Sequence, residues 1–156
     1  MSLKSLSRKM KKRVQTMERK LNEATVQVAL VVIEAVAKAT PVDTTKAMSN
    51  WQLKADYNET VLPPYSPGHK GDTSASSLKA VIRQARGFLR TYKGGEIKLF
   101  NNAPYIKRLN EGYSKQAPAG FIEISVLEAR HKALGRVLGK LRVRIADGND
   151  NRQRLN

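Results

Sequence analysis

The first forty residues contain no glycine and no proline, and their apolar residues recur at alternating steps of four and three. This spacing predicts a continuous helix from about Lys4 to Lys38, because it places the apolar side chains along one side of the helix. At 1.5 Å per residue such a helix is roughly 52 Å long, more than a chain of this size can cover with its own core. The pattern therefore predicts that other chains complete its packing, and hence that the protein assembles. The apolar series is Met10, Val14, Met17, Leu21, Ala24, Val28, Val31 and Ala35.

This helix changes character along its length. Up to Leu21 its apolar seam is narrow and flanked by charge, whereas residues 26–37 are apolar nearly all round, as is typical where a helix enters a core. We therefore expect a basic helical arm over residues 1–22, a single α+β domain over residues 23–145 and a flexible polar tail over residues 146–156. Within the domain we expect Val28, Val31, Ile33 and Val36 to be buried, and on the arm we expect contacts with a subunit or neighbour through Met10, Val14, Met17 and Leu21.

The remainder of the chain predicts a small sheet. Residues from Asn50 to Tyr57 alternate, with Trp51 facing inward and Gln52 facing solvent, which is typical of a half-buried strand. After a proline-rich loop over residues 58–72, a second strand is expected from Glu96 to Asn101. The fold class is therefore α+β, with a small, mostly antiparallel sheet packed against helices and a long projecting N-terminal helix.

Three further helices are expected after the first. They run from about Ser74 to Thr91, with Asp72, Thr73 or Ser74 as the N-cap, then over residues 104–110 and residues 121–145. Residues 141–145 also alternate as a strand would, so the end of the last helix stays open at this point. The predicted apolar face of the last helix is Phe121, Ile124, Leu127, Leu134, Leu138, Leu141 and Ile145.

The net charge of +16 is concentrated near the two ends of the chain. Residues 1–20 hold eight basic residues against Glu18, and residues 130–144 hold six basic residues and no acidic one. These helices are predicted to contact nucleic acid or an acidic protein surface, the alternative being solvated faces that aid solubility. All nine aromatic residues lie elsewhere, so DNA contacts would be made with phosphates and would carry little sequence information. The predicted basic surface is Arg8, Lys9, Lys11, Lys12, Arg13, Arg136, Lys140, Arg142 and Arg144.

The chain offers few residues for catalysis. It contains no cysteine, and its two histidines, His69 and His131, do not have a metal-binding spacing. No apolar run approaches the ~20 residues that span a bilayer. We therefore expect no enzymatic activity, no cofactor or metal ion, no contact with membranes, and synthesis in the cytoplasm.

Two segments resemble a known family. Residues 39–51, ATPVDTTKAMSNW, resemble the A-x-P-V-D-T-G-x-L-x-x-S-W stretch of the tail-completion, or neck, proteins of tailed bacteriophages, which include the minor tail protein Z type. Residues 101–120, NNAPYIKRLNEGYSKQAPAG, resemble that family's N-x-x-P-Y-A-x-x-L-E-x-G-x-S-x-Q-A-P-x-G stretch. The order of predicted elements also agrees over residues 20–145. We call these segments the first motif and the second motif.

The chain departs from the family's pattern at two places. Thr45 stands where the family has glycine, and because threonine tolerates positive φ poorly, a helical start is expected there instead of a left-handed turn. Asn110 stands where the family has glutamate, and Glu111 follows it. The residues expected to hold the motifs in place are Pro41, Asp43 as a cap, Thr44, Trp51 and Tyr105.

The resemblance implies a virion structural protein at the junction of head and tail. Such a protein would form a homo-oligomeric ring, with a hexamer favoured and twelvefold symmetry possible, and would complete or attach the tail. Its partners would be neighbouring neck and tail proteins, with possible nonspecific contact to packaged DNA, after assembly in the host bacterial cytoplasm. The alternative function is a nonspecific basic DNA-binding protein. In the second motif we expect intersubunit contacts rather than a plain connector, through Glu111, Gly112, Tyr113, Ser114 and Gln116.

Overall fold

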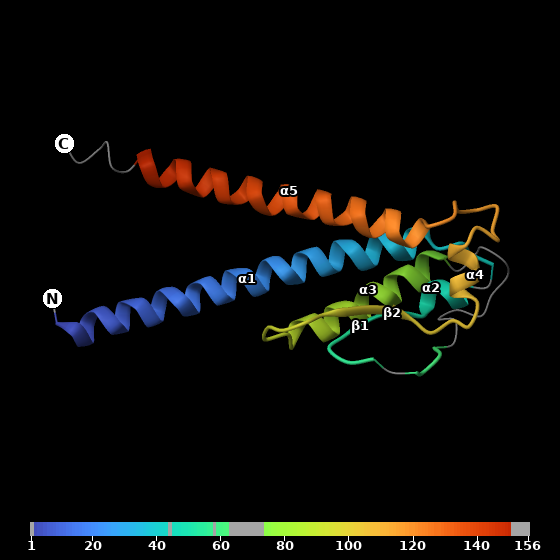
Figure 1. Ribbon diagram of the computed structural model, residues 1–156, viewed down its shortest axis with the longest axis horizontal. Helices are drawn as coiled ribbons and strands as arrows, with labels where there is room; N and C mark the ends of the chain where they lie inside the picture. Colours follow the sequence, from blue (N-terminus) through green and yellow to red (C-terminus); the bar gives the residue numbers. More distant parts are fainter. Residues whose placement is uncertain (1, 44, 58, 63–73, 151–156) are drawn as a thin grey trace.

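The computed structural model describes residues 2–43, 45–57, 59–62 and 74–150, with side chains described as far as residue 137. The α+β class predicted from the sequence is confirmed, because helices pack around a two-stranded antiparallel sheet. Figure 1 shows a body at one end of the molecule, from which the two longest helices extend on the same side. The elements in order are α1 (Leu3–Ala39), α2 (Lys46–Ser49), β1 (Trp51–Lys54), α3 (Ser74–Arg90), β2 (Lys98–Asn101), α4 (Ile106–Asn110) and α5 (Phe121–Asp150).

Helix α1 has the extent that the sequence predicts. The Ser2 side chain caps its start by accepting from the backbone N–H of Lys4 at 3.2 Å. At its other end Thr40 takes extended backbone angles, as expected for the residue before Pro41. Helices α1 and α5 run in opposite directions, pack together in the body and separate toward their outer ends (Figure 1).

The core lies between the second half of α1, helix α3, the sheet and the first half of α5. Ile33 and Val36 of α1 are fully buried, as expected, whereas Val28 and Val31 are only partly buried. Each fully buried aliphatic side chain contributes about 1.5–3 kcal/mol. The other members of the buried cluster are Val32, Ala37, Met48, Trp51, Leu53, Val81, Ala85, Leu89 and Ala129.

The sheet is shorter and more completely covered than its sequence suggests. Strand β1 begins at Trp51, which pairs with Asn101 of β2. The prediction that Gln52 faces solvent is wrong, because this residue is only 2% exposed. Gln52 pairs with Phe100 across the sheet, and the Tyr57 ring packs edge-on against Phe100 at 5.4 Å. The chain after β1 therefore folds back over the Gln52 face of the sheet, which was expected to face solvent.

Helix α5 is helical through residues 141–145, so the strand interpretation of that segment is wrong. The helix continues to Asp150, beyond the expected end at Ile145 and into the predicted tail. The predicted caps Asp72 and Thr73 of α3, and most of the proline-rich loop, lie outside the described residues. Across the described part of the chain, no helix has the length and apolarity needed to cross a membrane.

Candidate functional site

The two motifs meet in the folded chain. The Gln116 side chain accepts from the backbone N–H of Val42 at 2.9 Å and donates to the Val42 carbonyl at 3.1 Å. An amide that bonds both backbone groups of one residue imitates a strand partner. The loop of the second motif therefore lies against the first motif of its own chain, and Gln116, which was predicted to contact a neighbour, is engaged within the subunit.

The first motif contains a left-handed residue where none was expected. Thr45 has φ 62° and ψ −2°, so the prediction that its β-branched side chain would exclude positive φ is wrong. The Thr45 carbonyl accepts from the backbone N–H of Ser49 at 2.8 Å, which forms the first turn of α2. Thr45 also occupies the N-cap position that was assigned to Asp43, and its side chain makes no capping hydrogen bond. Thr45 is buried and adopts here a conformation that suits the glycine of the family pattern.

Buried polar contacts hold the first motif in place. The Trp51 indole donates to the Thr40 hydroxyl at 2.8 Å, and this hydroxyl donates to the Val36 carbonyl at 2.7 Å. The Asn50 side chain bonds both the N–H and the carbonyl of Leu62, at 2.7 and 2.8 Å. Because each group is buried with a partner, removing any one leaves a costly unsatisfied group. Pro41 is also buried, whereas Thr44 lies outside the described residues.

The second motif closes into a compact loop. Gly112 and Gly120 have φ values of 93° and 73°, and a Cβ on Gly112 would lie 3.1 Å from the Cβ of Ala119. The backbone N–H of Gly120 donates to the Asn110 carbonyl at 2.7 Å, so the two ends of the loop are tied together. The backbone conformation therefore explains why glycine stands at these two positions of the motif, because positive φ and close approach both favour glycine.

Asn110 was singled out only as a departure from the family pattern, but it has a definite structural role. Its side-chain oxygen accepts from the backbone N–H of Ile122 at 3.0 Å, and its amide donates to both Glu123 carboxylate oxygens at 2.9 and 3.0 Å. Asn110 thus caps the start of α5 from outside the helix. The bond from Asn110 lowers the pKa of Glu123, as does a backbone hydrogen bond within Glu123. Helical periodicity could not reveal this role, because the two partners lie on different elements.

A pocket of about 420 Å³ lies where the motifs meet. Asp43 and Lys46 line it from the first motif, and Tyr105 and Ser114 line it from the second. Tyr105 is partly buried at the start of α4. Tyr113 is 70% exposed at the same junction, and the Arg108 guanidinium lies 5.0 Å from its ring centre. Glu111 and Gly112 are exposed beside it.

The apolar seam of the arm is exposed to solvent. Met10, Val14, Met17 and Leu21 are 53–70% exposed, so the prediction that they lie outside the monomer's core is confirmed. Their contact with another subunit stays a prediction. Of the predicted apolar face of α5, Ile124, Leu127 and Leu134 are also exposed, whereas Phe121 is buried.

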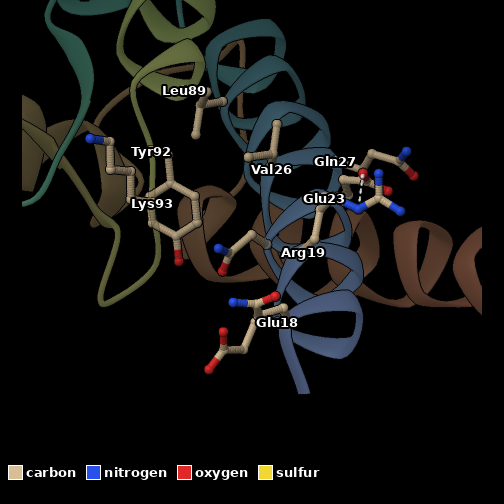
Figure 2. Close-up of a pocket in the computed structure, with 10 residues that line it drawn as sticks. Glu18, Arg19, Glu23, Val26, Gln27, Leu89, Tyr92 and Lys93 are labelled. Carbon is tan, nitrogen blue, oxygen red and sulfur yellow. Dashed lines mark ion pairs between the residues drawn. The ribbon is translucent and has the colours of Figure 1, made fainter. Parts of the chain in front are cut away.

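An open groove of about 610 Å³ marks where the arm leaves the body (Figure 2). On the α1 side it is lined by Arg19, Glu23 and Val26, and on the other side by Leu89 and Tyr92 near the end of α3. The side of α1 that is turned toward α3 therefore becomes polar where the arm begins. This change explains why the arm does not pack on its own body.

The predicted basic residues of the arm all lie in solvent. Arg8, Lys9, Lys11, Lys12 and Arg13 are exposed on α1, and Arg136 is exposed on α5. The ion pairs of the described residues, Arg19 with Glu23 and Lys38 with Glu34, lie outside this set. The side chains of Lys140, Arg142 and Arg144 lie outside the described part of the structure. The arm thus presents a concentrated positive surface that another molecule can approach.

Comparisons with protein-family models, with curated proteins and with solved structures found no match for this chain. Within the described residues, no group of three or more acidic, histidine or cysteine side chains is placed to hold a metal ion. His131 is exposed on α5, and His69 lies outside the described residues.

Proposed function

We propose that this protein is a structural subunit of a bacteriophage virion, which forms a ring at the head–tail junction and completes or attaches the tail. The observation that carries the proposal is the exposed apolar seam of the arm, formed by Met10, Val14, Met17 and Leu21. A projecting helix with such a seam is stabilised when another chain covers it, and repeated contacts of this kind close into rings.

The geometry of the two motifs supports the same proposal. Positive φ occurs at Thr45, Gly112 and Gly120, and at each of these three positions the family pattern has glycine. The bond between Gln116 and Val42 joins the most characteristic parts of both motifs. The resemblance that motivated the proposal is therefore physically consistent at the backbone level. It favours sixfold symmetry, with twelvefold symmetry as the alternative, and localisation in the virion after assembly in the host cytoplasm.

Deletion of residues 1–20 tests the role of the arm. The truncated chain should stay folded by circular dichroism, because the deleted residues are mostly exposed and contribute little to the core. The full chain should form rings that negative-stain images resolve, and the truncated chain should remain smaller by mass photometry. An unfolded truncated chain would show that the arm belongs to the core, and a full chain that stays monomeric at every concentration would oppose the proposal.

The second candidate function is nonspecific DNA binding, which the net charge of +7 over residues 1–20 favours. Phosphate contacts release counterions, so such binding should weaken steeply with salt and ignore sequence. Fluorescence anisotropy with two unrelated duplexes between about 0.05 and 0.3 M salt measures both properties. Equal, salt-sensitive affinities would support nonspecific binding, whereas sequence-selective binding that survives the higher salt would indicate a DNA-binding regulator.

A further inference from the structure

Helix α1 carries two apolar stripes on different sides. One is the core stripe, which includes Ile33 and Val36 and packs against α3 and the sheet. Toward the N-terminus this side becomes polar at Arg19 and Glu18, in the groove of Figure 2. The other stripe is the arm seam of Met10, Val14, Met17 and Leu21. At 100° per residue it lies roughly 100° around the helix axis from the core stripe.

The same chain already covers the continuation of this seam. Farther along α1 the seam reaches Val31 and Ala35, which with Ala129 of α5 line the groove between the two helices. Val31 and Ala35 are partly buried, and Ala129 is buried. The inner side of α5 thus partners the second half of the seam. The first half lies beyond the point where α1 and α5 separate (Figure 1) and has no such partner in the described part of the chain.

Helix α5 carries a matching exposed stripe on its outer side. Ile124, Leu127 and Leu134 are 45–59% exposed and lie opposite Ala129 and Ala133, which are buried. With His131, also exposed, they recur at steps of three, four and three. We call Ile124, Leu127, His131 and Leu134 the outer stripe. It is roughly 15 Å long and the arm seam roughly 17 Å, so their lengths and spacings suit helix-on-helix packing.

We propose that the arm seam of one copy packs on the outer stripe of α5 of the next copy. This inference rests on the proposed ring and names the surfaces that form it. Charge favours this partner over a second arm, because residues 1–20 carry +7 whereas residues 121–134 hold two acidic and two basic residues and are neutral overall. Packing one arm against another arm would instead bring +7 against +7 at close range.

The two stripes differ from one another, so each copy offers one surface to the copy before it and another to the copy after it. Such a head-to-tail contact generates a closed ring when its rotation closes. An arm–arm contact would be self-complementary and would stop at a dimer. The proposal therefore predicts a specific pattern of defects in variants and in their mixtures.

Two charge insertions test this pattern, one on each surface. Met17→Glu places a carboxylate in the arm seam, and Leu127→Glu places one in the outer stripe. Both residues are exposed, at 70% and 59%, so each variant should keep the wild-type circular dichroism spectrum and melting behaviour. Each should also be monomeric in mass photometry at concentrations where the wild type forms rings. Thr16→Glu is the matched control, because it adds the same charge at an exposed position of α1 outside the seam and should assemble normally.

Mixing the two variants gives the sharpest result. A Leu127→Glu chain retains an intact arm seam, and a Met17→Glu chain retains an intact outer stripe, so an equimolar mixture should give one-to-one dimers and nothing larger. Rings that persist in either variant, or a mixture that stays monomeric, would overturn this inference while leaving the proposed ring in place. A wild-type chain that never assembles would instead overturn the proposed function, and this inference with it.

Cross-linking provides an independent readout, because the chain contains no cysteine and introduced thiols are the only ones present. Val14→Cys chains mixed with Leu127→Cys chains should form disulfides between the two variants under mild oxidation. Cross-linking of each variant to itself should be weaker. Predominant coupling between two Val14→Cys chains would establish an arm–arm contact and refute the head-to-tail arrangement.

Discussion

Replacing Thr45 by glycine should stabilise the folded protein. The residue holds φ 62°, a region that costs an L-residue roughly 1–2 kcal/mol and that glycine enters freely. Its hydroxyl is buried and has no hydrogen-bond partner among the described residues, which adds a penalty of about 1–3 kcal/mol. Two costs oppose these gains. Glycine is more flexible in the unfolded chain, which costs about 0.5–1 kcal/mol, and the substitution removes one buried methyl group, which costs about 0.8 kcal/mol.

At mid-range the gains of about 3.5 kcal/mol exceed the losses of about 1.5 kcal/mol, so the net gain from Thr45→Gly is about 2 kcal/mol, which corresponds to a rise in Tm of roughly 4–8 °C for a chain of this size. Calorimetry measures this rise at one fixed protein concentration, because assembly shifts apparent stability by mass action. Thr45→Ala is the matched control, since it removes the hydroxyl but keeps the unfavourable φ, and it should gain less than glycine. A Tm below that of the wild type for Thr45→Gly would refute the assignment of strain to this residue.

Three further substitutions test the contacts that hold the motifs. Gln116→Glu should cost about 1 kcal/mol at neutral pH, because the ionised carboxylate repels the Val42 carbonyl. Only the protonated form of the new carboxyl side chain can both donate to and accept from Val42, as the amide does. Folding therefore raises the pKa of this carboxyl. The urea midpoint of the variant should match that of the wild type in acid and fall below it as pH rises. Asn110→Ala should cost about 1–2 kcal/mol in urea titrations. Because the bond from Asn110 lowers the pKa of Glu123, the share of this cost that comes from Glu123 is present at neutral pH and lost as pH falls, whereas the share from the Ile122 N–H remains. A cost that is unchanged in acid would therefore contradict Glu123 as a partner. Val36→Asp should abolish the helical circular dichroism signal, because an unpaired carboxylate in the core costs several kcal/mol, and a folded variant would contradict the burial of Val36.

Features that depend on neighbours along the chain could be predicted from the sequence. Helix α1 follows from a stretch without glycine or proline and ends where Pro41 requires an extended residue before it. The exposure of the arm seam was also predictable, because Met17 and its apolar companions are closely flanked by lysine and arginine. Helical periodicity and charge are local properties, so no knowledge of the tertiary fold was needed to interpret them.

Features that depend on which segments cover a residue in the folded chain could not be predicted from the sequence. Alternation placed Gln52 in solvent, but the segment after β1 folds back over that face. The intrinsic preference of Thr45 opposed positive φ, but the turn between Pro41 and α2 imposes it. Helix α5 is apolar on two sides, and periodicity cannot tell which of them α1 will cover, so the exposure of Leu127 could not be predicted. In each case the outcome depends on which segments lie against the residue in the folded chain, and a local preference of about 1 kcal/mol does not determine this.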